Sequence, residues 1–152
     1  MEKIELKRTL IAKCIEILES EIRETKKAMD DAQEEANSHK GAMESRYDTF
    51  KEEAQYKVGA YARKLVLLSQ QLSQIQLIKI GITTQAQLGS IVESEEKKYF
   101  LVGYLGPEPI QVGEEKYFPI SISSPIGKML LNKKAGETVH FNGKIIKIIN
   151  VF

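Results

Sequence analysis

Apolar or small side chains recur at alternating intervals of three and four residues along the first part of the chain. This is the heptad spacing of a helix that packs against another helix along one seam. No Pro or Gly interrupts residues 1–40, so the pattern predicts one long helix. Arg8 is the one charged position in the series, whose other members are Ile4, Ile11, Ile15, Leu18, Ile22, Thr25, Met29, Ala32 and Ala36.

A second series with nearly the same spacing follows after a short interruption. Between the two lies Asn37-Ser38-His39-Lys40-Gly41, which holds turn-favouring residues and a glycine suited to end a helix. Each limb has about 33 residues, or roughly 50 Å of helix, and equal limbs favour an antiparallel hairpin over residues 1–76 with its tip at about 37–44. A parallel coiled-coil dimer is the alternative, which the Gly41 break disfavours. The second series comprises Tyr47, Phe50, Ala54, Val58, Tyr61, Leu65, Leu68, Leu72 and Ile75.

Strongly β-prone runs replace the helical period after Ile75. They predict a small twisted sheet within residues 78–152. Pro119 lies inside one run and favours an edge strand or a strand start, because proline donates no ladder hydrogen bond. The runs cover residues 98–102, 117–122, 138–141 and 144–149, and the last two are joined by Asn142-Gly143, the strongest two-residue signal for a β-hairpin.

The stretch from Ile120 to Val139 predicts one short helix between two strands. Ser124 is a good N-cap, and Pro125 suits the first helical position because its missing N–H would find no partner there. Gly136 suits the turn that follows. We therefore expect an α+β protein, with an N-terminal antiparallel coiled-coil hairpin and a C-terminal β-sheet domain that carries one short helix.

Composition narrows the functional classes only a little. Of the 152 residues, 28% are charged and 42% are hydrophobic, as in soluble proteins that fold, and the net charge of +1 gives no basic field for nucleic acid. The single cysteine, Cys14, lies in a helical pattern and is expected to be a buried small hydrophobe. No apolar run reaches the roughly 20 residues of a membrane span, and the charged N-terminus does not resemble a signal peptide, so we expect a cytoplasmic protein.

The stretch after Ile120 resembles the second domain of the bacterial Gre transcript-cleavage elongation factors, a domain with the FKBP-like fold. The first half agrees, because that family has an N-terminal antiparallel coiled coil of about this length. The resemblance is carried by Ile120-Ser121-Ile122-Ser123-Ser124-Pro125-Ile126-Gly127-Lys128, then by Leu130-Leu131, Lys133, Lys134, Gly136-Glu137 and Val139.

Membership of this family would imply docking on RNA polymerase at the mouth of its secondary channel. Ser124, Pro125 and Ile126 match the family's docking loop, whereas Ser123 stands where an acidic residue often precedes the Ser-Pro. The coiled-coil tip, within residues 37–47, would then be inserted toward the active centre. The resemblance further implies a monomeric protein of the DNA-binding class, with indirect contact with nascent RNA and the active-site Mg²⁺.

The tip departs from the family's cleavage motif, in which an acidic pair helps to hold a second Mg²⁺. When the second limb is aligned, the family's Asp falls on Lys40 and its Glu on Met43, while Glu44 and Arg46 take the later positions. Lys40 repels a metal ion, and the neighbouring His39 is expected to be solvated. We therefore expect a regulator that is not an enzyme, with no catalytic residue, metal or cofactor of its own.

Two alternatives stay open at the level of sequence. Glu44 and Asp48 lie four residues apart on one helical face, so a shifted acidic tip would make the protein an active cleavage factor. The other alternative is a coiled-coil adaptor whose β domain binds a partner other than polymerase.

Overall fold

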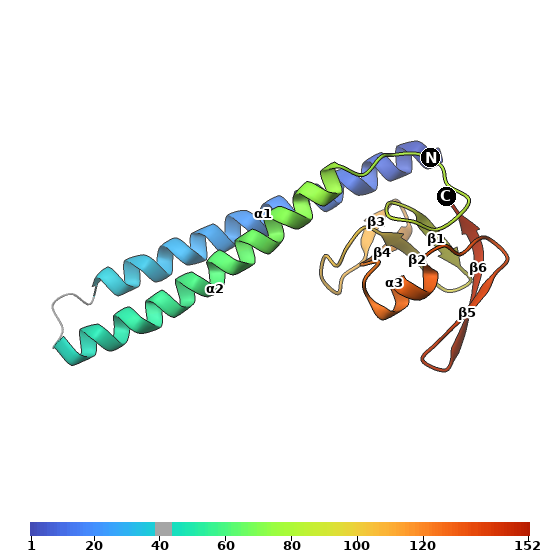
Figure 1. Ribbon diagram of the computed structural model, residues 1–152. Coiled ribbons are helices and arrows are strands. Elements are labelled where there is room, and N and C mark those ends of the chain that lie inside the picture. Colours follow the sequence, from blue (N-terminus) through green and yellow to red (C-terminus); the bar gives the residue numbers. More distant parts are fainter. Residues whose placement is uncertain (39–43) are drawn as a thin grey trace. The chain divides into compact units, whose positions relative to one another are not determined.

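The computed structural model describes residues 1–38 and 44–152 (Figure 1). Two long helices, α1 (Lys3–Ser38) and α2 (Glu44–Gln76), form an antiparallel hairpin, and a six-stranded sheet with one short helix follows. The predicted α+β class is confirmed. By its contacts the chain divides into two units, one of Met1–Ile15 with Ile75–Phe152 and one of Glu16–Gln74, so that α1 contributes to both.

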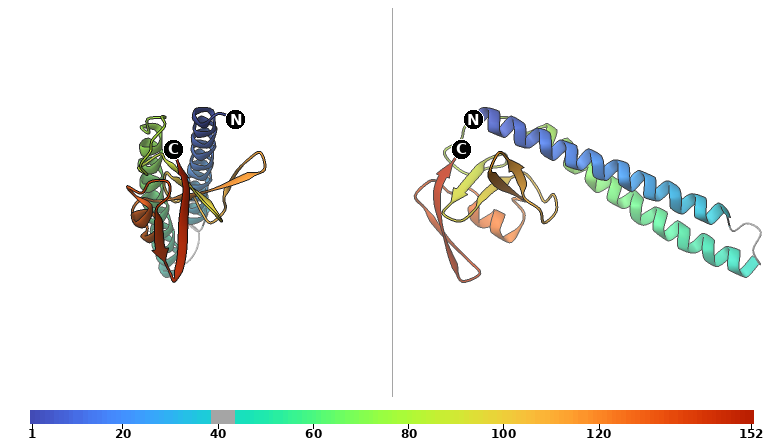
Figure 2. Two further views of the ribbon diagram at one scale, coloured as in Figure 1. Left: turned by 90° about the vertical axis from the view of Figure 1, so that its right-hand side faces the viewer. Right: turned by 180° about the vertical axis from the view of Figure 1, so that it is seen from behind.

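The unit Glu16–Gln74 is the paired part of the two helices, which run side by side in all views (Figure 2). Burial follows the predicted seam. Its most enclosed positions are Leu18, Thr25, Ala32 and Ala36 on α1 and Ala54 and Leu68 on α2. Thr25 is accommodated there because its hydroxyl donates a 2.7 Å hydrogen bond to the Glu21 carbonyl one turn earlier.

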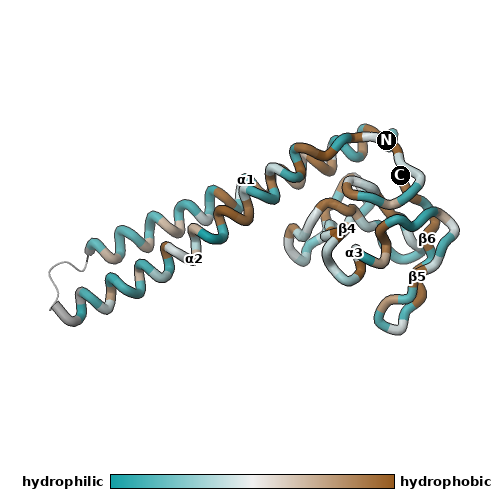
Figure 3. Tube along the Cα trace, in the orientation of Figure 1, coloured by the Kyte–Doolittle hydropathy of each residue, from teal (hydrophilic) through white to brown (hydrophobic). Residues whose placement is uncertain are grey.

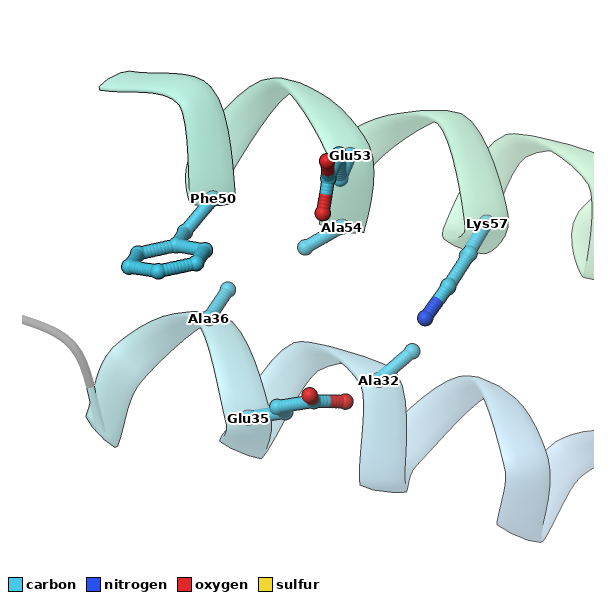
Figure 4. Close-up of a pocket in the computed structure, with 7 residues that line it drawn as sticks. All are labelled: Ala32, Glu35, Ala36, Phe50, Glu53, Ala54 and Lys57. Atoms are coloured by element: carbon cyan, nitrogen blue, oxygen red, sulfur yellow. The ribbon is translucent and has the colours of Figure 1, made fainter. Parts of the chain in front are cut away.

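Toward the distal end of the hairpin, the α1 side of the seam consists of small alanine side chains (Figure 4). Ala32 and Ala36 of α1 face Phe50 and Ala54 of α2 around a cavity of about 20 Å³, with charged side chains at its margin. A methyl group fills less of the space between helices than the leucines and isoleucines nearer the base. That the tip is the most mobile part of the hairpin stays a prediction.

The sheet has the strand order β3-β4-β2-β1-β6-β5 and is antiparallel except for the pair β2–β4. The predicted β-prone runs are confirmed as strands, and Asn142 and Gly143 form the hairpin turn with the positive φ angles that such a turn requires. β1 and β3 were not predicted. The strands are β1 (Ile91–Ser94), β2 (Lys98–Leu101), β3 (Ile110–Val112), β4 (Glu115–Ile120), β5 (Thr138–Phe141) and β6 (Lys144–Val151).

Pro119 lies in an interior strand rather than an edge strand, which corrects the sequence-based expectation. β4 lies between β2 and β3, and the Ile120 carbonyl accepts hydrogen bonds from Val102 and Gly103 at 3.1 and 3.0 Å. Since successive residues of a strand direct their polar groups to opposite sides, the Pro119 nitrogen faces the β3 side. Pairing with β3 ends at Tyr117, so no ladder bond is lost.

Both faces of the sheet are covered. On one face, the short helix α3 (Pro125–Leu130) inserts the fully buried Leu130 into a core that includes Val92 and Leu101. On the other, Ile91 and Phe100 are paired and fully buried. Phe152 exchanges two backbone hydrogen bonds with Ile91 and therefore lies on this second face.

The start of α1 is attached to the second face of the sheet by two lysines. The ammonium groups of Lys3 and Lys7 lie 4.9 and 5.8 Å from the centre of the Phe152 ring, within cation–π range. Lys7 also donates a 2.6 Å hydrogen bond to the Gly81 carbonyl and is only 2% exposed. Leu10 and Cys14, one and two turns after Lys7, are fully buried, and burial of Cys14 was expected. Burial raises the pKa of the Cys14 thiol to about 12.

Burial of Lys7 predicts a specific pH dependence of stability. Burial lowers the pKa of the Lys7 ammonium group from 10.5 to about 8, so between these values the unfolded chain binds more protons than the folded one. The free energy of unfolding contributed by Lys7 therefore rises with pH across this window. Denaturant unfolding at pH 7 to 9, largely below the range in which the Cys14 thiol of the unfolded chain loses its proton, should show this rise in the wild type and lose it in Lys7→Met. Parallel curves for the two proteins would contradict it.

Candidate functional site

The loop before α3 is held rigidly by the hydroxyl groups of two serines. Ser124 is the N-cap of α3: its Oγ donates to the Ser121 carbonyl at 2.6 Å and accepts from the Gly127 N–H at 3.1 Å. The Ser121 Oγ accepts from the Ser123 N–H at 3.1 Å. Pro125 takes the first helical position, as predicted. Serine caps of this kind satisfy N–H groups that a helix leaves unpaired at its start.

This arrangement exposes two of the predicted docking residues and partly buries the other two. Ser123 and Pro125 are exposed, while Ser124 is used for the cap. Ile126 is partly buried, because one side of it packs against the core. The four residues predicted for docking thus form one short surface segment whose shape is fixed by hydrogen bonds rather than by a partner.

Ile126 also lines a groove of about 500 Å³, which we call the α3 groove. Its apolar lining comes from Tyr99 on β2, Phe141 on β5, and Ile145 and Ile146 on β6. Ile145 is 63% exposed although it lies in a strand. An apolar groove with polar surroundings is a common form of protein docking site.

Charged side chains of both signs border the α3 groove. Lys97, Lys144 and Lys147 contribute positive charges, and Glu95 and Glu96 contribute negative ones. Burial and the charge of Glu96 raise the pKa of the Tyr99 phenol. The groove therefore combines an apolar floor with a charged rim, as protein-binding surfaces commonly do.

Another charged side chain of β2 lies outside the groove and stabilises the sheet. Lys98 on β2 forms salt bridges with Glu93 at 3.2 Å and Glu115 at 3.1 Å, which join β1, β2 and β4. Partial burial disfavours its charge, but hydrogen bonds to Glu115 and Glu93 outweigh this effect and raise the pKa of Lys98. Because Lys98 is occupied by these contacts, we assign it to the fold rather than to binding.

The predicted tip lies mostly outside the described residues. This holds for His39, Lys40 and Met43, and for the side chain of Glu44, which begins α2. Arg46 and Asp48 follow in the first turns of α2 with exposed side chains. The alternative acidic pair of Glu44 and Asp48 is therefore not tested.

Neither a metal site nor a membrane span is present among the described residues. Across residues 1–38 and 44–152, no three or more His, Cys, Asp and Glu side chains gather as a metal site would require. The helices in that same part of the chain include none that is long and apolar enough to span a membrane.

Sequence reasoning found the loop but missed the groove beside it. The groove joins residues from β2, α3, β5 and β6, so it depends on a strand order that periodicity does not reveal. One signal was present in the sequence. Residues 144–149 read Lys-Ile-Ile-Lys-Ile-Ile, which places isoleucine on both faces of a strand and leaves apolar side chains for a further contact.

Comparison with known proteins gives one family match. Residues 78–151 match the family model described as "Transcription elongation factor, GreA/GreB, C-term". A search of curated proteins found no match.

Solved structures of low similarity were also found. The crystal structure of the GreA factor homolog 1 (Gfh1) protein of Thermus thermophilus is 14% identical, covers 91% of this chain and 94% of its own, and has a TM-score of 0.35. That of Thermus aquaticus Gfh1 is 18% identical, with 90% and 92% covered and a TM-score of 0.36. The identities and TM-scores of these structures are too low to support a conclusion beyond that of the family match.

Proposed function

The chain belongs to the GreA/GreB family of transcription elongation factors, and we propose that it binds bacterial RNA polymerase through its C-terminal domain. The family match carries this proposal, because residues 78–151 include both the 123–126 loop and the α3 groove. The geometry supports it: Ser123 and Pro125 are exposed on a loop with a fixed shape, and Ile126 connects that loop to the groove.

We propose that the C-terminal domain binds at the mouth of the polymerase secondary channel and that the helical hairpin is inserted into this channel. There the tip, within residues 37–47, would modulate pausing, initiation or nucleotide access. Since Lys40 and Met43 stand where cleavage factors carry carboxylates, we propose that the protein acts without stimulating transcript cleavage. Such a role would take place where bacterial transcription does, in the cytoplasm.

Docking through the α3 groove can be tested with two matched isoleucines on β6. Ile145 lines the groove, whereas Ile149 does not, and their exposed fractions are similar at 63% and 59%. We expect Ile145→Ser to weaken binding to purified polymerase about tenfold, because an apolar contact is lost. Ile149→Ser should bind like the wild type. Fluorescence anisotropy of labelled protein measures both.

Pro125→Ala tests the loop independently of the groove. Pro125 is exposed, so the variant should fold normally but bind more weakly. Equal binding by the wild type, Pro125→Ala and Ile145→Ser would show that polymerase contacts another surface. A wild-type protein that does not bind polymerase at all would favour the alternative, a coiled-coil adaptor whose β domain binds another partner.

A further inference from the structure

A long uncharged segment occupies the C-terminal half of α2. No Asp, Glu, Lys or Arg occurs between Lys64 and Lys79, in a chain of which 28% of residues are charged. Part of this segment faces the seam and is buried, as at Leu68. Other large apolar side chains of the segment, such as Leu67, are exposed. Hydrophobic colour marks α2 near the middle of the hairpin, whereas hydrophilic colour dominates toward the tip (Figure 3).

The outward side of this segment is a shallow groove within the unit Glu16–Gln74, which we call the uncharged face. Val66 is 57% exposed, so this groove offers one large apolar side chain to a partner. The face is lined by Leu65, Val66, Ser69, Gln70, Ser73 and Gln74.

The shape of the uncharged face fits an α-helix. Its six residues form two rows with a spacing of four, Leu65–Ser69–Ser73 and Val66–Gln70–Gln74, and the groove lies between them. A ridge of side chains on a second helix packs into such a groove. The small side chains of Ser69 and Ser73 allow that helix to approach closely.

The absence of charge on this face restricts the kind of surface that a partner helix can present to it. A charged side chain placed against the uncharged face would lose water without gaining an ionic partner, which is costly. The outward side of α2 nearer the tip differs, because it carries exposed charges such as Glu52 and Arg63. The occupant therefore presents an uncharged, partly apolar helical face.

The area of the uncharged face indicates whether its occupant is a second copy of this chain or another partner. Residues 65–74 span about 15 Å of helix, and at a width of about 10 Å they bury roughly 300 Å² over both partners. A stable protein–protein contact requires about 1,200 Å² or more. The uncharged face cannot hold a second copy by itself, but it can strengthen the binding of a partner that is already held elsewhere.

We propose that the uncharged face of α2 packs against an amphipathic α-helix of RNA polymerase, the partner that the C-terminal domain docks on. This inference rests on the proposed function and adds a second contact to it. It assigns to α2 a role in affinity that is separate from the tip.

Lysine substitutions on the uncharged face test the inference. We expect Val66→Lys and Ser73→Lys each to weaken binding to purified polymerase about tenfold. The matched control is Gln55→Lys, an exposed position eleven residues, and hence about three turns, before Val66 on the same side of α2, where charges are already present. It should bind like the wild type. All three variants should unfold at the wild-type temperature, because these side chains are exposed.

The outcomes separate this inference from the proposed function. Wild-type binding by Val66→Lys and Ser73→Lys, together with weakened binding by Ile145→Ser, would overturn the role of the uncharged face and leave docking intact. Absence of binding by the wild type would overturn both. Sedimentation velocity tests the remaining possibility, that a second copy of this chain occupies the uncharged face. A wild-type dimer that Val66→Lys dissociates would show this and overturn the inference.

Discussion

Gly127→Ala should be one of the most damaging single substitutions in the C-terminal domain, lowering the free energy of unfolding by about 3 kcal/mol. A Cβ atom at this position would lie 1.9 Å from the Ser121 carbonyl oxygen and 2.9 Å from the Ser124 Oγ. Backbone cannot move aside as a flexible side chain can. The loop must therefore open, and the hydrogen bonds that Ser124 makes with Ser121 and Gly127 would be lost. Thermal or denaturant unfolding measures the effect.

Gly59→Ala is the matched control for this substitution. An added Cβ at Gly59 would meet only the end of the flexible Arg63 side chain, at 3.4 Å. Gly59 lies inside α2, where alanine is favoured over glycine by about 0.5–1 kcal/mol, so we expect equal or higher stability. Gly127→Ala should also lose polymerase binding, because the loop that we propose for docking is displaced. A Gly127→Ala protein as stable as the wild type would contradict the described loop.

The second large effect is a gain of activity at the tip. The double variant Lys40→Asp with Met43→Glu restores the two carboxylates that the family's cleavage motif carries at these positions. Carboxylates are the ligands that Mg²⁺ prefers, and in two-metal sites they help to position the attacking water. We expect Mg²⁺-dependent 3′-end cleavage of backtracked RNA to rise at least about tenfold above that with the wild type.

Two controls make this result specific. Lys51→Asp also replaces a lysine by a carboxylate, but at an exposed position about two turns past the start of α2; it should leave cleavage unchanged. Glu44→Gln in the wild type addresses the alternative acidic tip and should have no effect. If wild-type protein cleaves and Glu44→Gln does not, Glu44 is a functional carboxylate and the shifted-tip reading is correct.

The helical hairpin was the part of the fold most completely predictable from sequence. Helix pairing depends on local spacing, and a seam from Leu18 to Ala36 is visible in any window of two heptads. The turn could be placed only approximately. Asn37 and Ser38, expected in the tip, are the last residues of α1, because turn-favouring residues also end helices well.

The start of α1 shows why the seam alone was insufficient. Leu6, Leu10 and Cys14 are buried beside the seam, on a row with a spacing of four. They are buried because Met1–Ile15 belong to the same unit as the sheet, a long-range contact that heptad spacing does not encode. The wider apolar stripe in this part of the sequence was the available signal.

In the sheet, the strongest strands and the α3 cap were predictable, whereas strand order was not. Ser124, Pro125 and Gly136 behave as expected because capping and turn geometry are local. β3 has only three residues, and β1 (Ile91–Ser94) ends in two polar residues, so neither has a strong strand pattern of its own and both are defined by their neighbours. The label FKBP-like for this domain stays a prediction.

The most direct test of the central claim uses wild-type protein and purified bacterial RNA polymerase halted on backtracked RNA. Binding and Mg²⁺-dependent 3′-end cleavage are measured together, with an established Gre cleavage factor as the positive control. We expect saturable binding, competition with the cleavage factor, and no cleavage above that of polymerase alone. Absence of binding, or stimulated cleavage by the wild type, would contradict the claim that this chain docks as a Gre factor without the family's chemistry.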